Sequence, residues 1–426
     1  MRASRSRSFA NIRRSPIIHS GLGCSPRPGQ RERSTYPILG HRSRQGFTPT
    51  PEVDQGHRSR RGTARMPYLY SDEQSQIREE VRRALAGTID PAKLRLLLET
   101  QGQYDAAFWQ AARDMGWTAM GIAEEDGGLG LSLIETLIVA EETGRVVAGA
   151  PFLASAFAAT QALKLGGASD RLQALASGDQ IAAIAFAEGS EPLAHGVTLS
   201  ADHKLTGEKT AILAAAVADF AIVLCADTSG KPQIALVDLG AEGVSRAIFG
   251  TIDNSRCVAT LHFDNAPATL LSLDFPARIA RECLGRLALH LAAEAVGGTD
   301  TCITLASSYA NQRQAFGQAI GKFQAVKHAI AEMYVANELA RASILDAAVR
   351  LQNGDADAEA YVAAARLNAV HAYENGAAAA TQVHGGIGVT WEADLHLHYR
   401  RSRSLAAEAG APWYWEDRIV SMLEEA

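Results

Sequence analysis

Residues 313–333 read RQAFGQAIGKFQAVKHAIAEM, and this stretch carries the strongest structural signal in the chain. It opens with Arg313, which is followed by a Phe-Gly pair. Apolar residues then recur at helical spacing, at Ile320, Phe323, Val326, Ile330 and Met333. This periodicity predicts an amphipathic helix with one face in a core. Because a guanidinium forms forked hydrogen bonds with phosphate or carboxylate, the stretch predicts an anion clamp beside a buried helix.

The composition of the whole chain is that of a globular protein. Its 426 residues are enough for two or three domains, and they are 47% hydrophobic and 21% charged. The longest apolar candidate, AILAAAVADFAIVLCA at 211–226, is interrupted by Asp219 and is shorter than the roughly 18 residues of a membrane span. We expect a core strand and turn there, and no membrane span.

The spacing of the cysteines argues against two kinds of structure. They are scattered and form no CxxC pair: Cys24, Cys225, Cys257, Cys283 and Cys302. This spacing argues against a metal site of the zinc type and against a disulfide framework, and it suits the reducing cytoplasm. We therefore expect no metal.

The first 65 residues differ in charge from the rest. They contain fourteen Arg and three acidic residues, a net +11, whereas the remainder has 27 basic and 44 acidic residues, a net −17. They show no apolar periodicity, so we expect a disordered Arg-rich extension over 1–65. A nucleic-acid-binding arm lacks any motif here, and a transit peptide fits the Arg/Ser bias. We favour a mis-assigned start, with Met66 as the first residue, and expect no nucleic-acid partner.

From Met66 to residue 180 the pattern is helical. Ser71 and Gln74 have the spacing of a capping box, and Ile77, Val81 and Leu85 follow at helical spacing. Farther along, a turn contains three glycines, at 127, 128 and 130. It lacks the lysine and the Ser/Thr of a phosphate-binding P-loop, so we expect a structural loop between helices.

The pattern changes twice after residue 180. Short β-branched or alternating runs between turn residues predict an antiparallel β-domain over 181–266. From 267 to 426 long helical patterns return. They begin near Pro276 with an apolar stripe at Ile279, Cys283, Leu287 and Leu291. The fold class is therefore α+β, with a helical domain over 66–180 and a helical bundle over 267–426.

This order of domains, together with four motifs, resembles the acyl-CoA dehydrogenase family, flavoproteins that oxidise the α,β bond of acyl-CoA thioesters. The resemblance covers about 360 residues, from Met66 onward. Its most specific motifs are RQAFGQAIGKFQ at 313–324 and QVHGGIGVTWEADLHLHYRR at 382–401. MGWTAMGIAEEDGGLGLSLIETLIVAEETGR at 115–145 and LTGEKTAILAAAVAD at 205–219 are similar to two further family signatures. The family implies a C-terminal four-helix bundle and an oligomeric oxidoreductase of lipid metabolism and β-oxidation in the bacterial cytoplasm.

The resemblance implies that FAD lies between the subunits of a dimer. One subunit's β-domain covers the flavin ring, and the neighbour's C-terminal domain holds the pyrophosphate and adenine. Arg313 would then pair with the pyrophosphate, Phe316 would pack against the cofactor, and Gln324 would bond in the adenosine region. Taken alone, Arg313 is better explained as a surface helix cap.

The second motif supplies the remaining cofactor residues. Gln382, Gly385 and Gly386 would approach the pyrophosphate through side chain and backbone. Glycine permits such a close approach to a bulky anion, although glycines can also merely turn the chain. Since both motifs occur with the family's spacing, we expect FAD to be bound.

The catalytic base is less well defined. Many members place a glutamate in a Tyr-Glu-Gly-Thr segment, but the corresponding region here reads SLAAEAGAPWYWEDR at 404–418. Glu408 is the candidate there, although an exposed carboxylate at a helix end explains it better. Other members place the base at a position that corresponds to Leu287, for which Glu294 and Glu282 are the nearest acids. A solvated helix face is the better explanation for Glu294.

The flavin-facing half of the β-domain also departs from the family. A Thr-Glu-Pro-x-Ala-Gly-Ser-Asp segment is expected, but AFAEGSEPLAHG at 185–196 keeps only an echo of it at Glu188, Gly189 and Ser190. The usual Trp-Ile-Thr-Asn is replaced by AILA at 211–214. No hydroxyl beside the flavin N5 is therefore identifiable.

Three hypotheses follow. The first is a subunit of a heteromeric acyl-CoA dehydrogenase, such as a heterotetramer, in which a second dehydrogenase-like subunit supplies the catalytic carboxylate. The second is a self-sufficient homo-oligomer that uses Glu408 or Glu294. The third is a scaffold subunit that has lost flavin. The first two imply an acyl-CoA substrate and an electron-transfer acceptor protein.

Overall fold

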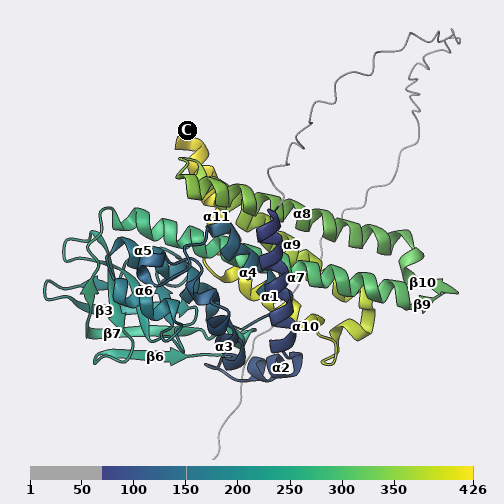
Figure 1. Ribbon diagram of the computed structural model, residues 1–426, viewed down its shortest axis with the longest axis horizontal. Helices are drawn as coiled ribbons and strands as arrows, with labels where there is room; N and C mark the ends of the chain where they lie inside the picture. Colours follow the sequence, from purple (N-terminus) through teal and green to yellow (C-terminus); the bar gives the residue numbers. More distant parts are fainter. Residues whose placement is uncertain (1–69, 150, 426) are drawn as a thin grey trace, which may run out of the picture. The chain divides into compact units, whose positions relative to one another are not determined.

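The computed structural model describes residues 70–149 and 151–425 (Figure 1). The Arg-rich extension expected over 1–65 lies outside the described residues. The three alternatives for it, a nucleic-acid-binding arm, a transit peptide and a mis-assigned start, concern the same residues. Within the described part of the chain, no helix is long and apolar enough to cross a membrane.

Helices make up the first part of the described chain, as the sequence predicts. They are α1 (Asp72–Thr88), α2 (Pro91–Glu99), α3 (Ala106–Asp114), α4 (Leu133–Arg145), α5 (Ala159–Leu165) and α6 (Ser169–Ala176). The expected capping box starts α1. Ser71 Oγ accepts from the Gln74 backbone N–H at 3.1 Å, and Gln74 Oε1 accepts from the Ser71 N–H at 3.0 Å. Local sequence therefore fixes where this helix begins.

The glycine-rich turn before α4 has a structural explanation, as expected. Gly127 and Gly130 have positive φ values of 83° and 61°, which glycine adopts most readily. A Cβ on Gly128 would lie 2.0 Å from the carbonyl oxygen of Ile122, so only glycine fits there. The turn brings the chain into α4 without any need for a bound phosphate.

The middle of the chain forms one sheet of eight strands. They are β1 (Ala182–Ala185), β2 (Thr198–Leu199), β3 (Lys204–Ile212), β4 (Phe220–Ala226), β5 (Pro232–Asp238), β6 (Val244–Ile248), β7 (Ala259–Pro267) and β8 (Thr269–Leu270). The order is β6-β7-β3-β2-β4-β5-β8, and β1 also pairs with β4. Most pairs are antiparallel, but β1 and β2 run parallel to β4, so the sheet is mixed rather than purely antiparallel.

The last part of the chain is a helical bundle with a small hairpin. Its elements are α7 (Pro276–Gln312), β9 (Gln314–Ala315), β10 (Gln318–Ala319), α8 (Gln324–Asn353), α9 (Ala358–His384), α10 (Leu395–Ala407) and α11 (Pro412–Glu425). Pro276 occupies the first turn of α7, and the predicted stripe on that helix is buried. Helix α8 begins at Gln324. Ile320, the first residue of the apolar pattern predicted for this helix, lies before it in a 3-10 turn, Ile320–Lys322.

A close crossing of α4 and α7 fixes the bundle against the N-terminal helices. A Cβ on Gly297 would lie 1.8 Å from the Glu141 carbonyl oxygen, and a Cβ on Gly144 would lie 2.0 Å from that of Glu294. One continuous hydrophobic cluster then joins the N-terminal helices, the sheet and the bundle. Helix α7 therefore presents its N-terminal half to the sheet. Its other end carries the hairpin β9–β10, at the opposite end of the view from β3, β6 and β7 (Figure 1).

Candidate functional site

The residues expected to hold a cofactor gather at the hairpin end of the bundle. Arg313 caps the C-terminus of α7, Gln324 begins α8, and Gln382 lies in the last turn of α9. The rings of Tyr309 and His384 stack with centroids 4.3 Å apart, which joins the ends of α7 and α9. Segments about 70 residues apart in the sequence therefore meet at one surface, as a shared binding site requires.

Arg313 and Phe316 are available to a ligand at this surface. Arg313 is exposed, and it makes no ion pair with any residue in 70–149 or 151–425. Phe316 has a φ of 53° and is 94% exposed, and its ring lies edge-on to Phe323 at 6.1 Å. An exposed aromatic ring on a residue with a strained backbone conformation, three residues after an exposed arginine, is typical of a binding surface.

The start of α8 adds a second source of positive potential. Phe323 occupies its N-cap and offers no side-chain cap. The first N–H groups of a 30-residue helix therefore face outward, where they favour an anion. A Cβ on Gly321 would lie 3.0 Å from the Ala310 carbonyl oxygen, so the turn before α8 lies directly on α7. The Ile320 N–H also donates to the Arg313 carbonyl oxygen at 2.9 Å, which joins this turn to the end of α7.

The glycines after α9 leave room for such an anion. Gly385 has φ 62° and ψ −140°, a conformation that is essentially restricted to glycine. A Cβ on Gly385 or on Gly386 would meet no described atom within 4 Å. By contrast, a Cβ on Gly388 would lie 2.7 Å from the Thr381 carbonyl oxygen. The residues present at this end of the bundle thus fit the pyrophosphate end of FAD.

A cavity of about 310 Å³ lies at the other end of α7, against the sheet. Its walls come from β1, the loop that follows β1, the end of β3, α7 and the turn between α10 and α11. Ile184 and Ile212 line it from the sheet, and Leu284 and Leu287 line it from α7. Glu408 lines it as well. The structure therefore brings together Leu287 and Glu408, the two positions where the resemblance places a base.

Glu408 is held in an ion pair rather than exposed. It lies at the C-cap of α10, so the expected helix end is confirmed, but its side chain is only 11% exposed and the expected exposure is wrong. Arg256 Nε donates to Oε1 at 2.9 Å and Arg256 Nη2 donates to Oε2 at 2.5 Å. Ser404 Oγ donates to Oε1 at 3.0 Å. Every carboxylate oxygen is thereby engaged.

Glu294 is also buried, so the predicted solvated helix face is wrong. The side chain is 2% exposed because α7 is enclosed by α4 on this side. Its Oε1 accepts from Arg256 Nη1 at 3.1 Å and from Arg401 Nη1. Arg401 Nε also donates to Asp253 Oδ2 at 2.6 Å. Glu294 does not line the cavity described above, so its place is that of a structural counter-ion.

The electrostatics of Arg256 favour its charged form. Burial lowers the pKa of this guanidinium, and the carboxylates of Glu294 and Glu408 more than offset burial, so the pKa lies above its ordinary value. No local sequence pattern indicates this network, because Arg256 and Glu408 are 152 residues apart. Only the packing of the sheet against the bundle brings them into contact.

A second ion pair shapes the loop between β1 and β2. Lys209 Nζ donates to Glu188 Oε1 at 2.6 Å and to the carbonyl oxygens of Phe186 at 3.2 Å and Ala194 at 2.5 Å. The same Glu188 oxygen accepts from the Gly196 N–H at 2.9 Å. Burial lowers the pKa of Lys209, and the bond to Glu188 opposes that effect. The ion pair between Lys209 and Glu188 thus fixes the shape of the loop that faces the cavity.

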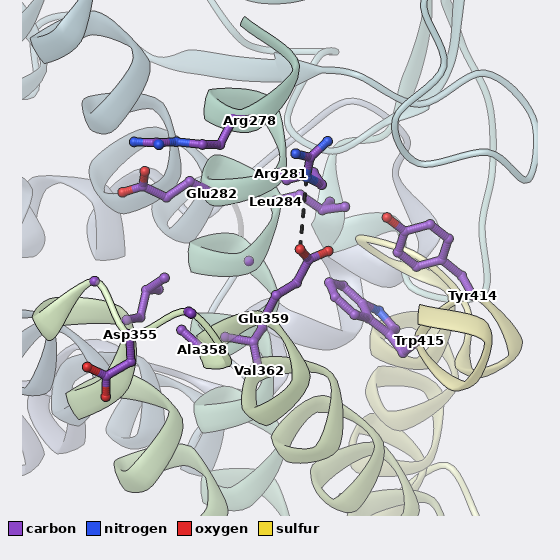
Figure 2. Close-up of a pocket in the computed structure, with 14 residues that line it drawn as sticks. Arg278, Arg281, Glu282, Leu284, Asp355, Ala358, Glu359, Val362, Tyr414 and Trp415 are labelled. Atoms are coloured by element: carbon purple, nitrogen blue, oxygen red, sulfur yellow. Dashed lines mark ion pairs between the residues drawn. The ribbon is translucent and has the colours of Figure 1, made fainter. Parts of the chain in front are cut away.

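A larger cavity of about 420 Å³ adjoins the first one (Figure 2). Leu284 lines both cavities. Polar and aromatic side chains surround the second cavity, and they include Arg278, Arg281, Glu282, Glu359, Tyr414 and Trp415. No sequence pattern indicates this cavity, because its lining is drawn from four separate helices and one loop.

Comparison with known proteins extends these observations. Profiles of the acyl-CoA dehydrogenase N-terminal and C-terminal domains match residues 71–177 and 277–412. Acyl-CoA dehydrogenase IpdE2 of Mycobacterium tuberculosis is 31% identical over 342 residues, which are 80% of this chain and 94% of the relative.

Two solved structures share the fold. The ChsE4-ChsE5 complex from Mycobacterium tuberculosis has a TM-score of 0.77 at 24% identity and covers 84% of this chain and 99% of that chain. The structure of PigA with FAD and proline has a TM-score of 0.76 at 22% identity, and the matched region covers 84% of this chain and 99% of the PigA chain.

Proposed function

Since this chain belongs to the acyl-CoA dehydrogenase family, we propose that it works as one subunit of a heteromeric, FAD-dependent acyl-CoA dehydrogenase. The chain holds the phosphate end of a cofactor shared with a partner subunit, and the partner supplies the catalytic carboxylate. The observation that carries the proposal is the ion pair between Arg256 and Glu408, which engages the carboxylate in the cavity wall.

The chemistry explains why that ion pair matters. Desaturation of an acyl-CoA needs a base for the α-proton, a polarised thioester carbonyl and a hydride acceptor. FAD, when bound, accepts the hydride from the β-carbon. A base must turn a carboxylate oxygen toward the α-proton, but the ion pair with Arg256 holds both Glu408 oxygens in place. Protonation of Glu408 would also leave a buried cation without its full partner, which is costly.

The position that could replace Glu408 carries no base. Leu287, at the second place where family members put a carboxylate, is an apolar residue in the same cavity wall. The end of β3 contributes Ala211, Ile212 and Leu213, which are also apolar. These side chains offer neither a base nor a donor for the thioester carbonyl.

The length of α7 supports a cofactor shared between subunits. Leu287 lies in the cavity wall and Arg313 follows the last residue of the helix, 26 residues farther on. At 1.5 Å per residue this separation is about 39 Å. One flavin cannot place its ring at that cavity and its pyrophosphate at Arg313. The clamp on this chain therefore serves a cofactor whose ring lies on another subunit.

The partner follows from the same division of labour. One solved structure of similar fold is that of the ChsE4-ChsE5 complex, whose two names denote two different proteins. This likeness supports pairing of the present chain with an unlike subunit. A reduced cofactor must be reoxidised, so we propose an electron-transfer acceptor protein as a further partner. We place the enzyme in the cytoplasm, since the cysteines among the described residues are free thiols, which suits a reducing compartment.

The domain division is proposed as 66–180, 181–266 and 267–426. The change from α6 to β1 at Ala182 and the start of α7 at Pro276 support these boundaries. The clamp then belongs to the third domain. The cavity is built from the second and third domains, which the hydrophobic cluster holds together.

A second candidate function is a self-sufficient homo-oligomer in which Glu408 acts as the base. The position of Glu408 in the cavity wall favours it. Catalysis would then require Arg256 to release the carboxylate when substrate binds.

Co-expression tests the proposal. The chain is produced alone and together with a candidate dehydrogenase-like partner, and the bound flavin is measured by absorbance after gel filtration. We expect flavin only in the complex, and we expect Arg313→Gln to release it. Arg83→Gln is the matched control, because Arg83 is an exposed arginine on α1. A yellow single chain whose flavin is bleached by anaerobic acyl-CoA would contradict the heteromeric proposal.

A further inference from the structure

We propose that Arg95 is a positioning residue for FAD binding, which acts by holding the chain segment that carries the cofactor turn rather than by contact with the cofactor. The cofactor turn is the 3-10 turn Gly385–Val389, and residues 390–394 lead from it into α10. The ligand class is the pyrophosphate of a dinucleotide. The inference rests on the proposed function, because it requires FAD at the two glycines that begin this turn.

The cofactor turn has few anchors of its own. It begins with two glycines, which have no side chain to pack. Ile387 is 50% exposed and Val389 is 74% exposed, so neither side chain is buried in the core. Gly388 lies against α9, since a Cβ there would be 2.7 Å from the Thr381 carbonyl oxygen. One end of the turn is therefore fixed on α9, whereas a glycine-rich segment keeps conformational freedom at its other end unless another element restrains it.

Arg95 supplies that restraint from a distant part of the chain. Its Nη2 donates to the Glu392 carbonyl oxygen at 3.3 Å and also pairs with the Asp394 carboxylate. Asp394 is the N-cap of α10, but its side chain makes no capping hydrogen bond, so the carboxylate serves the pair with Arg95. Because Arg95 and Asp394 are 299 residues apart, the contact ties the N-terminal helices to the segment after the cofactor turn.

Helix α2 gives Arg95 a firm base. Asp90 caps the helix through its side chain, which fixes where it begins. Leu94 and Leu98 are buried in a cluster with Leu397 of α10, and Figure 1 shows α2 next to α10. Arg95 follows Leu94 directly, so its side chain starts from a backbone that is packed against the helix it holds.

The stability of the fold does not explain this arginine. Its side chain is 24% exposed and that of Asp394 is 41% exposed, and ion pairs at such a surface contribute little to folding. Arg95 Nε is buried without a hydrogen-bond partner among the described residues, which is a cost that a surface arginine normally avoids. An arginine kept in place at this cost is better explained by the segment that it holds.

A restraint outside the contact surface changes affinity through the rate of association. Without Arg95 the turn spends a smaller fraction of time in its binding conformation, and the apparent affinity for FAD falls by that fraction. The dissociation rate depends on contacts within the complex, so it should change little. A residue that touches the cofactor, as proposed for Arg313, has the opposite signature, since loss of its contact speeds dissociation.

Rebinding of FAD tests the inference. FAD is removed from the purified complex of this chain with its co-expressed partner. The rates of FAD association and dissociation are then measured from the change in flavin fluorescence by stopped flow. The variants are Arg95→Gln, Asp394→Asn and the two changes together, with Arg313→Gln for comparison. Arg83→Gln is the matched control, and thermal unfolding without FAD checks that each variant is folded.

We expect Arg95→Gln to slow association about threefold to tenfold and to leave dissociation within about twofold of the unmodified complex. The double variant should be no slower than Arg95→Gln, because the two residues act as one pair. If Arg95→Gln does not fold, Asp394→Asn decides by the same rates.

Unchanged association in the folded variants, or a lost affinity that comes from faster dissociation, would overturn the inference while leaving the proposed function intact. Failure of the proposed function has a different signature, namely an Arg313→Gln complex that binds and releases FAD at the unmodified rates, and the inference then fails with it.

Discussion

Arg256 donates two hydrogen bonds to Glu408, from Nε to Oε1 at 2.9 Å and from Nη2 to Oε2 at 2.5 Å. Its third group, Nη1, donates to Glu294 at 3.1 Å. The pair links the turn before β7 to the end of α10, so it fastens the sheet to the bundle. It also makes the carboxylate at the cavity wall a structural counter-ion.

Removing the arginine alone should destabilise the protein strongly. Arg256→Met leaves Glu408 and Glu294 with less positive charge in a buried site, which costs roughly 3–5 kcal/mol of unfolding free energy. Urea denaturation measures the loss, and Arg83→Gln should change stability by less than about 0.5 kcal/mol. The double variant with Glu408→Met should recover part of the loss. An Arg256→Met protein as stable as the unmodified one would refute the structural role.

Gly386→Val should separate cofactor binding from folding. The added Cβ meets no described atom within 4 Å, so the midpoint of thermal unfolding of the complex without FAD should not change. The valine would occupy the space beside the expected pyrophosphate, and the affinity for FAD should fall about tenfold or more. Flavin absorbance after gel filtration measures the binding. Full flavin retention would show that the anion lies elsewhere.

Two glycine-to-alanine changes should have opposite effects on stability. Gly297→Ala places a Cβ 1.8 Å from the Glu141 carbonyl oxygen and forces α4 away from α7, at a cost of about 2 kcal/mol or more. Gly87→Ala, in α1, meets nothing within 4 Å and should stabilise the protein by about 0.5–1 kcal/mol. Urea denaturation compares the two. Equal effects would mean that the helix crossing is not tightly packed.

Stability should fall in mild acid because of two buried histidines. Burial lowers the pKa of His290 to about 3, and burial with the nearby charge of Arg401 lowers that of His398 to about 3. Between pH 6.5 and 3 the unfolded chain therefore binds protons that the folded protein does not. The unfolding free energy then decreases by about 1.4 kcal/mol per pH unit for each histidine as the pH falls.

Urea denaturation between pH 7 and pH 5 checks this slope. The double variant His290→Gln with His398→Gln should lose less stability over that interval than the unmodified protein. Parallel curves for the two proteins would show that these histidines are not responsible.

The sequence predicted features that depend on local chemistry. The capping box at Ser71, the glycine turn before α4 and the buried stripe on α7 each follow from spacing within a few residues. No sequence pattern marks strand β6, because Val244–Ile248 is partly exposed and shows no clean alternation. The parallel pairing of β1 with β4 is likewise not indicated, since strand direction depends on tertiary packing.

The surroundings of the candidate base could not be predicted. The solvated face expected for Glu294 is wrong because α4 covers that side of α7, and a single helical segment does not show which helix will pack on it. The partner of Glu408 lies 152 residues away, so no local pattern indicates it. The residues expected to bind FAD, in the motifs at 313–324 and 382–401, could be predicted to share one surface, because the two motifs have the family's spacing. Their role in binding FAD stays a prediction.

The reduction of flavin by acyl-CoA tests the central claim most directly. Anaerobic octanoyl-CoA is added to the complex of this chain with its partner, and the flavin absorbance is followed by stopped flow. If the partner supplies the base, the rate with Glu408→Gln should stay within about twofold of the unmodified complex, because Glu408 touches no reacting atom. A loss of about 10²-fold or more in the bleaching rate of a folded, flavin-loaded Glu408→Gln complex would contradict the account and assign the base to this chain.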